Sequence, residues 1–281
     1  MAQPADTDTQ NMGKSNNIAA IVVCYHPESE LLRTNVGAFA GDVERVLVWR
    51  NSADDLGWLK EEFGNVEFMG DGENAFIARP LNEALRYCAD KGYKWLLTMD
   101  QDSVFEDFAA FKKDILNREE SDVAVYAPNV NNLYCDCDDH KAETVITSGS
   151  VIDVEKALET GGFKEKYEIY WVDGEYCYRA RKSGYKIIVT GRHHLKQQFG
   201  RQTRTLFGFE TSNYSAPIYY RLIRNMLWEH REHGSKAVSF RCIAHTLLFT
   251  TRGIILGERQ KAKKLFAIIK GLWHGSFNSY L

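Results

Sequence analysis

An apolar run of strand length ends in two carboxylates at residues 94–103, which read Lys-Trp-Leu-Leu-Thr-Met-Asp-Gln-Asp-Ser. A run that is apolar on both faces is typical of a strand buried in a parallel sheet with helices on either side. Ligands of such sheets bind beyond the carboxyl ends of the strands, where Asp100 and Asp102 stand. Two neighbouring carboxylates favour a divalent cation with hard oxygen ligands, Mg2+ or Mn2+. The alternative is a polar turn in which Asp102 or Ser103 caps the next helix.

Apolar runs and helical patterns alternate through most of the chain. The expected strands are residues 18–26, 44–49, 66–69, 94–99, 123–128, 145–152 and 185–190. The expected helices are residues 28–39, 58–63, 80–91, 105–116, 154–159 and 170–183. This alternation with short links predicts an α/β fold, a Rossmann-like and mostly parallel sheet flanked by helices. Residues 129–143 are polar and are expected to form a loop.

The charge is distributed unevenly. Residues 218–281 hold eleven Lys and Arg and three Glu, a net +8, which leaves −11 for the remainder of a chain whose total is −3. Helical or apolar patterns cover residues 219–231, 240–256 and 261–273. One interpretation is a basic helical extension that packs on the α/β domain or forms a homodimer interface. The other is an interfacial membrane helix whose basic rim lies near anionic lipid headgroups.

Several classes of protein are disfavoured. Residues 1–17 are polar and are expected to be a disordered tail, without the apolar core of a signal peptide. No run of 18 apolar residues predicts a membrane span, and the six cysteines lack a disulfide framework, which favours the cytoplasm. No Gly-x-Gly-x-x-Gly follows the first strand, so a dinucleotide oxidoreductase is not expected. Basic residues mixed with aliphatic ones argue against nucleic-acid binding.

A second acidic pair, Asp173 and Glu175, opens a predicted helix directly after Tyr170 and Trp171. One interpretation is electrostatic, because acids near a helix N-terminus stabilise it by about 0.3–1 kcal/mol. The other is that one acid is a general base whose pKa is adjusted by partial burial beside aromatic rings.

The order of these motifs resembles glycosyltransferase family 2, the inverting enzymes of the GT-A fold, and most closely its bacterial rhamnosyltransferase-like branch. The matching segments are residues 20–27, 73–82, 96–103, 147–150, 172–179 and 219–225. The resemblance covers about residues 18–230, and the pairing of Asp-Gln-Asp-Ser with Val-Asp-Gly-Glu-Tyr-Cys-Tyr-Arg is its most specific feature. It implies a GT-A catalytic domain at residues 18–215, with a nucleotide-sugar half at about 18–104 and an acceptor half at about 105–215. A helical region would follow at residues 216–281.

The resemblance assigns residues to the donor side. Tyr25 would help to hold the base and ribose, and Asp100 would face the ribose. Asp102 would hold the metal, Mg2+ or Mn2+, that bridges the phosphates of a nucleotide-sugar. The remaining residues expected beside the nucleotide are Asn51, Asn74 and Arg79, and Asp100 is a further candidate metal ligand.

On the acceptor side, Asp173 matches the position of the family's general base. Glu175 would orient the acceptor or act as the base itself. Trp171 would lie beside the acceptor, and Gly149 would allow the acceptor sugar to approach the backbone. Arg179 would pair with either acid.

Three positions depart from the family pattern. Arg50 stands where relatives have Asp before Asn51, and Ala75-Phe76 replaces a glycine pair. Gln197 stands where relatives have a metal-binding His, and His194, with His193 beside it, is the alternative ligand in a shifted register.

The resemblance implies a metal-assisted inverting glycosyltransferase in cell-surface polysaccharide synthesis. The cysteines favour the cytoplasm, and an interfacial role of the basic C-terminal helices would add peripheral contact at the inner face of the membrane. The donor would be dTDP-L-rhamnose, and the acceptor a glycan or a polyprenyl-diphosphate-linked sugar. Two alternatives stay open: a UDP-hexose or UDP-galactofuranose donor, and a nucleotide-sugar-binding protein that has lost catalysis.

Overall fold

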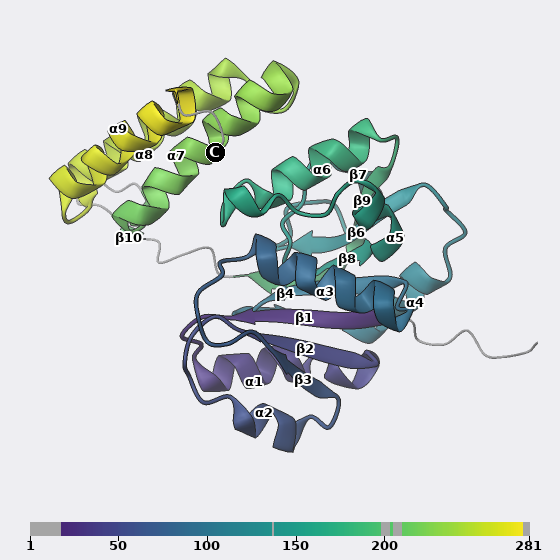
Figure 1. Ribbon diagram of the computed structural model, residues 1–281. Coiled ribbons are helices and arrows are strands. Elements are labelled where there is room, and N and C mark those ends of the chain that lie inside the picture. The colour runs from purple at the N-terminus through teal and green to yellow at the C-terminus, as the bar shows by residue number, and fades with distance from the viewer. Residues whose placement is uncertain (1–17, 137, 198–202, 205–209, 278–281) are drawn as a thin grey trace, which may run out of the picture.

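The computed structural model describes residues 18–136, 138–197, 203–204 and 210–277; the expected tail at residues 1–17 lies outside them. Figure 1 shows a twisted sheet between two layers of helices, with the C-terminal helices beside it as a further layer. The predicted α/β class, a sheet flanked by helices with a helical C-terminal region, is confirmed.

Strands and helices alternate along the chain. The first elements are β1 (Ile18–Cys24), α1 (Ser29–Gly37), β2 (Arg45–Arg50), α2 (Gly57–Glu62), β3 (Val66–Met69), α3 (Ala78–Lys91) and β4 (Trp95–Asp100). They are followed by β5 (Ser103–Phe105), α4 (Phe108–Leu116), β6 (Val123–Val130), β7 (Asp139–Lys141), β8 (Ser150–Asp153), α5 (Val154–Glu159), α6 (Val172–Lys182) and β9 (Lys186–Gln197). The short strands β10 (Thr203–Arg204) and β11 (Glu210–Thr211) form a separate pair.

The main sheet has the strand order β3-β2-β1-β4-β8-β6-β9-β5, and β7 pairs with β9. The first four strands are parallel, as the sequence predicts. Strand β8 is antiparallel to both of its neighbours, and β5 and β7 are antiparallel to β9. The sheet is therefore parallel from β3 to β4 and mixed from β8 to β5.

Strand β1 is buried on both faces, as its uninterrupted apolar sequence requires. Alternate residues of a strand point to opposite faces, so Ile18, Ala20 and Val22 pack with α1 and α4. The intervening residues pack with α3, α5 and α6 on the other face. Helices thus cover both faces of the sheet (Figure 1), and the predicted Asp100 is the last residue of β4.

Helix α4 and strand β9 differ in their bounds from the predicted elements. Helix α4 begins at Phe108, not at residue 105, because the Asp107 carboxylate accepts a hydrogen bond from the Ala110 N–H (2.9 Å) as a helix cap. The preceding residues form β5 instead. Strand β9 continues from the predicted end at residue 190 to Gln197, since β5 and the end of β6 pair with the added residues.

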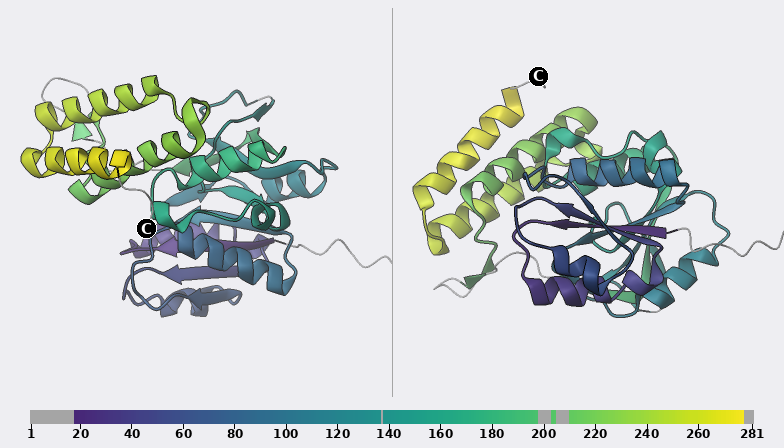
Figure 2. Two further views of the ribbon diagram at one scale, coloured as in Figure 1. Left: turned by 45° about the horizontal axis from the view of Figure 1, so that its top comes forward. Right: turned by 60° about the horizontal axis from the view of Figure 1, so that its bottom comes forward.

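The C-terminal helices are α7 (Ala216–His233), α8 (Phe240–Gly257) and α9 (Lys261–Phe277). They share an apolar core of Tyr219, Ile223, Met226, Ile254 and Ile268 together with smaller side chains. Helix α9 packs along α7, which lies between α9 and the sheet (Figures 1 and 2). Among the described residues, none of the helices combines the length and the apolar content needed to cross a bilayer.

Candidate active site

Three of the predicted acids, Asp100, Asp102 and Asp173, interact electrostatically at the carboxyl end of the sheet. Asp100 is the last residue of β4, Asp102 follows it, and Asp173 lies in the first turn of α6. Burial raises the pKa of Asp100 to about 6; the amide of Gln197 opposes this rise, and the charges of Asp102 and Asp173 add to it. Burial also raises the pKa of Asp102 and of Asp173. In the described part of the chain, no lysine or arginine is among the groups that perturb these three acids.

A closed ring of hydrogen bonds orients Asp100. Its N–H donates to the Ser148 hydroxyl (3.0 Å), which donates to the Ser103 hydroxyl (2.7 Å). Ser103 donates to the side-chain oxygen of Gln197 (2.6 Å), whose amide nitrogen donates to the Asp100 carboxylate (2.9 Å). Gln197 therefore lies beside the acids, at the position where relatives carry histidine. A lone glutamine in the sequence gave no signal of this ring.

The structure does not bring His194 to the acids. His194 precedes Gln197 by three residues on β9, so the two side chains lie on opposite faces of the strand. The His194 Nε2 is 3.9 Å from a carboxylate oxygen of Asp136, and His193 contacts Asp114 at 3.2 Å. Of the two predicted metal ligands on β9, Gln197 contacts an acid of this site and His194 does not.

The predicted nucleotide residues lie at the carboxyl ends of β1 and β2 and at the start of α3. The half-exposed Tyr25 is tied by its backbone to the side chain of Gln101, which accepts from the Tyr25 N–H (2.7 Å) and donates to its carbonyl (3.1 Å). Arg79 is exposed in the first turn of α3. Gln101 is a residue that the sequence did not single out.

Asn51 and Asn74 shape the loop before α3. The buried Asn51 accepts from the Ala75 N–H (2.9 Å) and donates to the Phe76 carbonyl (2.6 Å). The Asn74 side chain accepts from the Phe76 N–H (2.9 Å). Phe76 has φ +57°, a left-handed conformation that glycine adopts without strain. The two asparagines therefore hold a phenylalanine at one of the positions where relatives carry glycine.

A cavity of about 400 Å³ lies beside Asp173. Its walls come from β6, the segment 143–146, the start of α6 and helix α7, and it includes Trp171. Gly149 does not line it. A side chain at Gly149 would lie 2.8 Å from Leu195 and 2.9 Å from Pro128, and φ is +81° there. The glycine is therefore needed for packing against these two side chains, and its expected role in acceptor approach stays a prediction.

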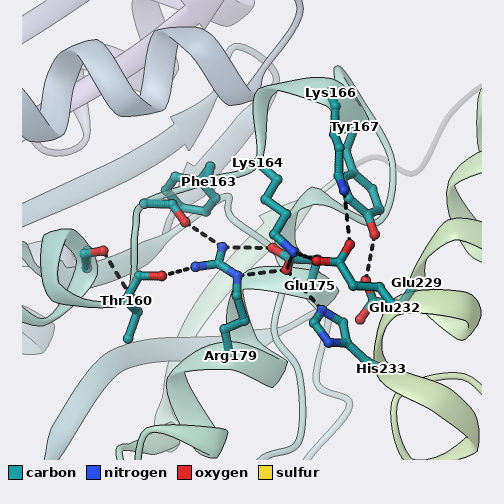
Figure 3. Close-up of polar contacts among 12 residues, drawn as sticks. Thr160, Phe163, Lys164, Lys166, Tyr167, Glu175, Arg179, Glu229, Glu232 and His233 are labelled. Carbon is teal, nitrogen blue, oxygen red and sulfur yellow. Dashed lines mark hydrogen bonds and ion pairs between the residues drawn. The ribbon is translucent and has the colours of Figure 1, made fainter. Parts of the chain in front are cut away.

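Glu175 lies outside the cavity, in a buried ion-pair cluster (Figure 3). Its side chain is 0% exposed and forms a two-pronged pair with Arg179, with both N–O distances 2.7 Å. Lys164 (2.8 Å) and His233 (3.1 Å) contact the same carboxylate. Burial alone would raise the pKa of Glu175, but Arg179 and Lys164 outweigh it and hold the pKa below its ordinary value.

The buried Glu229 of α7 completes this cluster and borders the cavity. The ligand atoms of Glu175, Glu229 and His233 lie within 4.8 Å of one another. Since Arg179 and Lys164 already neutralise Glu175, a further cation is disfavoured, and we interpret the cluster as a structural link between α6 and α7. The predicted acceptor roles of Glu175 and Arg179 are not supported by these positions.

The segment that carries Trp171 to the cavity is strained. Glu168, Tyr170 and Trp171 have φ of +60°, +64° and +63°. Non-glycine residues in this region cost about 1–3 kcal/mol each and persist only where the surroundings enforce them. Asp173 lies two residues after Trp171, so this segment sets the position of the predicted base.

Helix α7 supplies the groups that hold this segment. The fully buried Asn225 donates its side-chain N–H groups to the carbonyls of Tyr167 (2.7 Å), Ile169 (2.8 Å) and Tyr170 (3.0 Å). The side-chain oxygen of Asn225 accepts from the Arg224 guanidinium (2.9 Å). Sequence analysis noted Asn225 only as the last residue of a matching segment.

Comparison with known proteins gives matches that span nearly the whole chain. No family model matches it. The sequence is 23% identical over 288 residues to the dTDP-rhamnosyl transferase RfbF of Shigella flexneri, covering 92% of this chain and 96% of the relative.

Solved structures share the fold. Residues 1–349 of TarS from S. aureus, in complex with UDP-GlcNAc, match with a TM-score of 0.60 at 15% identity, covering 92% of this chain and 80% of that one. The mannosyltransferase PcManGT from Pyrobaculum calidifontis, with GDP-Man and Mn2+, matches with a TM-score of 0.54 at 14% identity, covering 94% and 76%. GalNAc-T7, with UDP, GalNAc and Mn2+, matches with a TM-score of 0.58 at 9% identity over 76% of this chain, which spans about half (48%) of the GalNAc-T7 chain.

These likenesses confirm two predictions made from the sequence. The fold is that of the GT-A glycosyltransferases. The enzyme class is a glycosyltransferase, since the sequence relative is one over almost its full length.

The first prediction concerns Glu229. Burial and the charge of Glu175 raise the pKa of Glu229 to about 7, so the folded state binds a proton that the unfolded state releases between about pH 4.5 and 7. The free energy of unfolding of the wild type should therefore fall in this window as the pH rises. Relative to wild type, Glu229→Gln should gain about 1–3 kcal/mol between about pH 5 and pH 8, measured by urea unfolding.

The matched control is Glu232→Gln, three residues further along α7. Lys164 and Lys166 outweigh burial and lower the pKa of Glu232 to about 2, so its charge stabilises the fold above its ordinary pKa of 4.5. Relative to wild type, Glu232→Gln should therefore lose stability as the pH rises from about 2 to 4.5, and the difference should stay constant between pH 5 and 8. A gain of Glu232→Gln over wild type between pH 5 and 8, like that expected of Glu229→Gln, would contradict the assignment.

The second prediction concerns Asn225. In Asn225→Leu the carbonyls of residues 167, 169 and 170 lose their donor, so the strained segment should open locally. Hydrogen exchange measured by mass spectrometry should speed up by about tenfold or more in the peptide covering residues 165–175. Ile268→Ala, a cavity variant in the core of α7–α9, is the control for general destabilisation. Equal acceleration of this peptide in both variants would refute the local role.

Proposed function

We propose that this glycosyltransferase is an inverting enzyme that transfers a sugar from a nucleotide-sugar to an acceptor hydroxyl, with Asp173 as the general base. The observation that carries the proposal is that the three acids lie at different parts of the site. Asp173 lines a cavity large enough for a sugar, whereas Asp100 and Asp102 lie at the strand ends on the donor side. The proposed boundary between the nucleotide-sugar half and the acceptor half, near residue 104, separates the same groups.

The donor would lie across the carboxyl ends of β1, β2 and β4. Tyr25, Asn51, Asn74 and Arg79 are the proposed contacts for the nucleotide. Asn51 is engaged with the loop backbone at 2.6 and 2.9 Å, so its proposed contribution is to hold the loop in shape for the nucleotide. Tyr25 and Arg79 are exposed enough to touch a ligand directly.

The donor set fits a divalent cation. Asp100 and Asp102 raise each other's cost of ionisation, and no lysine or arginine among the described residues offsets it, so a cation of charge two would relieve their repulsion. Asp102 and Asp100 would hold it, with the amide oxygen of Gln197 as a further hard ligand if the amide turns over. When bound, Mg2+ or Mn2+ would neutralise charge that develops on the diphosphate leaving group. The Mn2+ in the complexes of PcManGT and GalNAc-T7 is consistent with this chemistry.

Asp173 would accept the proton of the acceptor hydroxyl as the oxygen attacks the anomeric carbon. The bond from that carbon to the diphosphate breaks on the opposite side, so the configuration inverts and the nucleoside diphosphate leaves. Burial raises the pKa of Asp173, which makes the carboxylate a stronger base. Trp171 borders the same cavity and would provide an apolar face for the acceptor sugar.

For the donor we propose dTDP-L-rhamnose, on the motif resemblance and the name of the relative RfbF. A UDP-hexose or UDP-galactofuranose donor is the alternative. The proposed acceptor is a glycan or a polyprenyl-diphosphate-linked sugar on the cytoplasmic side, in the synthesis of a cell-surface polysaccharide. The rival function, a binding protein without catalysis, rested on Arg50 and Gln197. Its support is weakened because Gln197 contacts Asp100 directly at 2.9 Å.

Asp173→Asn should reduce transfer by about 10²- to 10⁴-fold, because the amide cannot accept the proton. Donor affinity should change little. Transfer is measured as nucleoside diphosphate released from dTDP-L-rhamnose with an acceptor preparation, and affinity by calorimetry. Glu175→Gln is the control from the same helical turn: it should lower the melting temperature by breaking the buried pair with Arg179. Activity of Asp173→Asn within a few-fold of wild type would place the base elsewhere.

Asp102→Asn should remove the metal dependence of donor binding. Because a ligand stabilises the folded state by RT ln(1 + [L]/Kd), dTDP-L-rhamnose with Mn2+ should raise the melting temperature of the wild type, and a chelator should reverse part of the rise. Asp90→Asn changes an exposed acid at the far end of α3 and should respond like wild type. An unchanged Mn2+ effect in Asp102→Asn would remove Asp102 from the proposed metal site.

A further inference from the structure

Helix α9 carries its large apolar side chains on the outside. Its buried face consists largely of small residues that pack against α7: a side chain at Gly271 would lie 2.8 Å from the Tyr220 carbonyl, and one at Gly275 would lie 2.8 Å from Leu227. Its outer face bears Phe266, Ile269, Trp273 and Phe277, which are 61–68% exposed. A helix that faces only water normally has the opposite distribution.

Helix α8 has a similar outer face. The residues that it buries are Ile243, Thr250, Gly253 and Ile254. Its exposed large apolar residues are Phe240, Leu248, Phe249, Ile255 and Leu256. Isolated exposed apolar residues are normal in proteins, but nine large ones on two neighbouring helices form a group that indicates an interaction surface.

The exposed charges of these helices and their connection are all positive. They are Arg241, Arg252, Arg259, Lys261, Lys263 and Lys270. The single acidic residue between Phe240 and Phe277 is Glu258, which is buried. Its carboxylate accepts from Lys264 (2.7 Å) and Tyr219 (2.6 Å), so it contributes no negative charge to the surface.

We propose that the exposed faces of α8 and α9 bind an anionic lipid bilayer. Aromatic and aliphatic side chains on a helix, mixed with lysine and arginine and without carboxylates, match the interface between acyl chains and anionic headgroups. A second copy of the chain fits less well, because two such faces would bring like charges together. The surface goes beyond the proposed sugar transfer, which needs no bilayer for its chemistry.

Helix α7 connects this surface to the cavity. Leu222 and Glu229 of α7 line the cavity, whereas α9 packs on α7 through Gly271 and Gly275. The layer of α7–α9 lies beside the sheet in both views of Figure 2. A bilayer bound to α9 is thereby held in a fixed relation to Asp173, which suits an acceptor carried on a lipid.

The test is co-sedimentation of the full chain with vesicles of phosphatidylcholine alone and of phosphatidylcholine mixed with phosphatidylglycerol. The chain should bind the anionic vesicles, and less so at high salt. The variants Phe266→Ser with Trp273→Ser, and Lys263→Glu with Lys270→Glu, should each weaken binding by roughly tenfold or more. The matched controls are Leu158→Ser on α5 and Lys60→Glu with Lys182→Glu, which are exposed elsewhere and should bind like wild type.

The fluorescence of Trp273 gives a second measurement of membrane binding, which can be made on the wild-type chain. Brominated lipid should quench its fluorescence, and Trp273→Phe identifies its share of the signal. Absence of binding to anionic vesicles, or equal binding by the face variants, overturns the proposal. The proposal is also overturned if the chain stays in solution with vesicles but forms a dimer in sedimentation analysis, and if this dimer dissociates in the variant Phe266→Ser with Trp273→Ser.

Activity separates this inference from the proposed function. The face variants should keep their transfer to a water-soluble acceptor. Loss of vesicle binding with intact transfer supports a docking surface distinct from catalysis. If the wild type binds vesicles but shows no transfer, the docking surface stands and the proposed chemistry fails.

Discussion

Asn225 holds the strained segment whose backbone is left-handed at Glu168, Tyr170 and Trp171, because its side chain donates to the carbonyls of residues 167, 169 and 170. The same segment is fixed on two further sides. The Glu168 carbonyl accepts from the N–H groups of Ile77 and Ala78 at the start of α3, and the Glu168 carboxylate accepts from Arg221 of α7. The start of α3, the first turn of α6 with Asp173, and helix α7 are therefore linked through this segment.

The two acids in the first turn of α6, Asp173 and Glu175, differ in their ion-pair partners. Glu175 has a two-pronged partner in Arg179, a second cation in Lys164 and no exposed surface, so its charge is used within the fold. Asp173 accepts a hydrogen bond from the Gly174 N–H (2.8 Å), has no cation partner in the described chain and borders a cavity. A charge that the protein leaves uncompensated beside open space is available to a ligand.

The sequence predicted the parts of the structure that depend on local pattern. Uninterrupted apolar runs identified β1 and β4 because both faces of each are covered. The motifs around Asp100 and Asp173 singled out acids whose charges act on one another in the structure. The sequence could not predict β7 or the extension of β9, since these strands form through pairing with residues distant in the chain. Nor could one sequence distinguish Glu175 from Asp173, two residues apart on one turn, because the difference lies in Lys164 and in the residues of α7.

The departures from the family pattern have physical explanations that only contacts provide. Gln197 replaces a histidine, yet it closes the ring from Ser103 to Asp100. Phe76 replaces a glycine, and its left-handed backbone is held by Asn51 and Asn74 while Arg221 of α7 stacks on its ring at 4.4 Å. A larger side chain at that position thus adds a contact between the loop before α3 and helix α7. The helix that holds the strained segment thereby also stabilises this loop, so the C-terminal region contributes to the candidate site as well as presenting the outer face of α9.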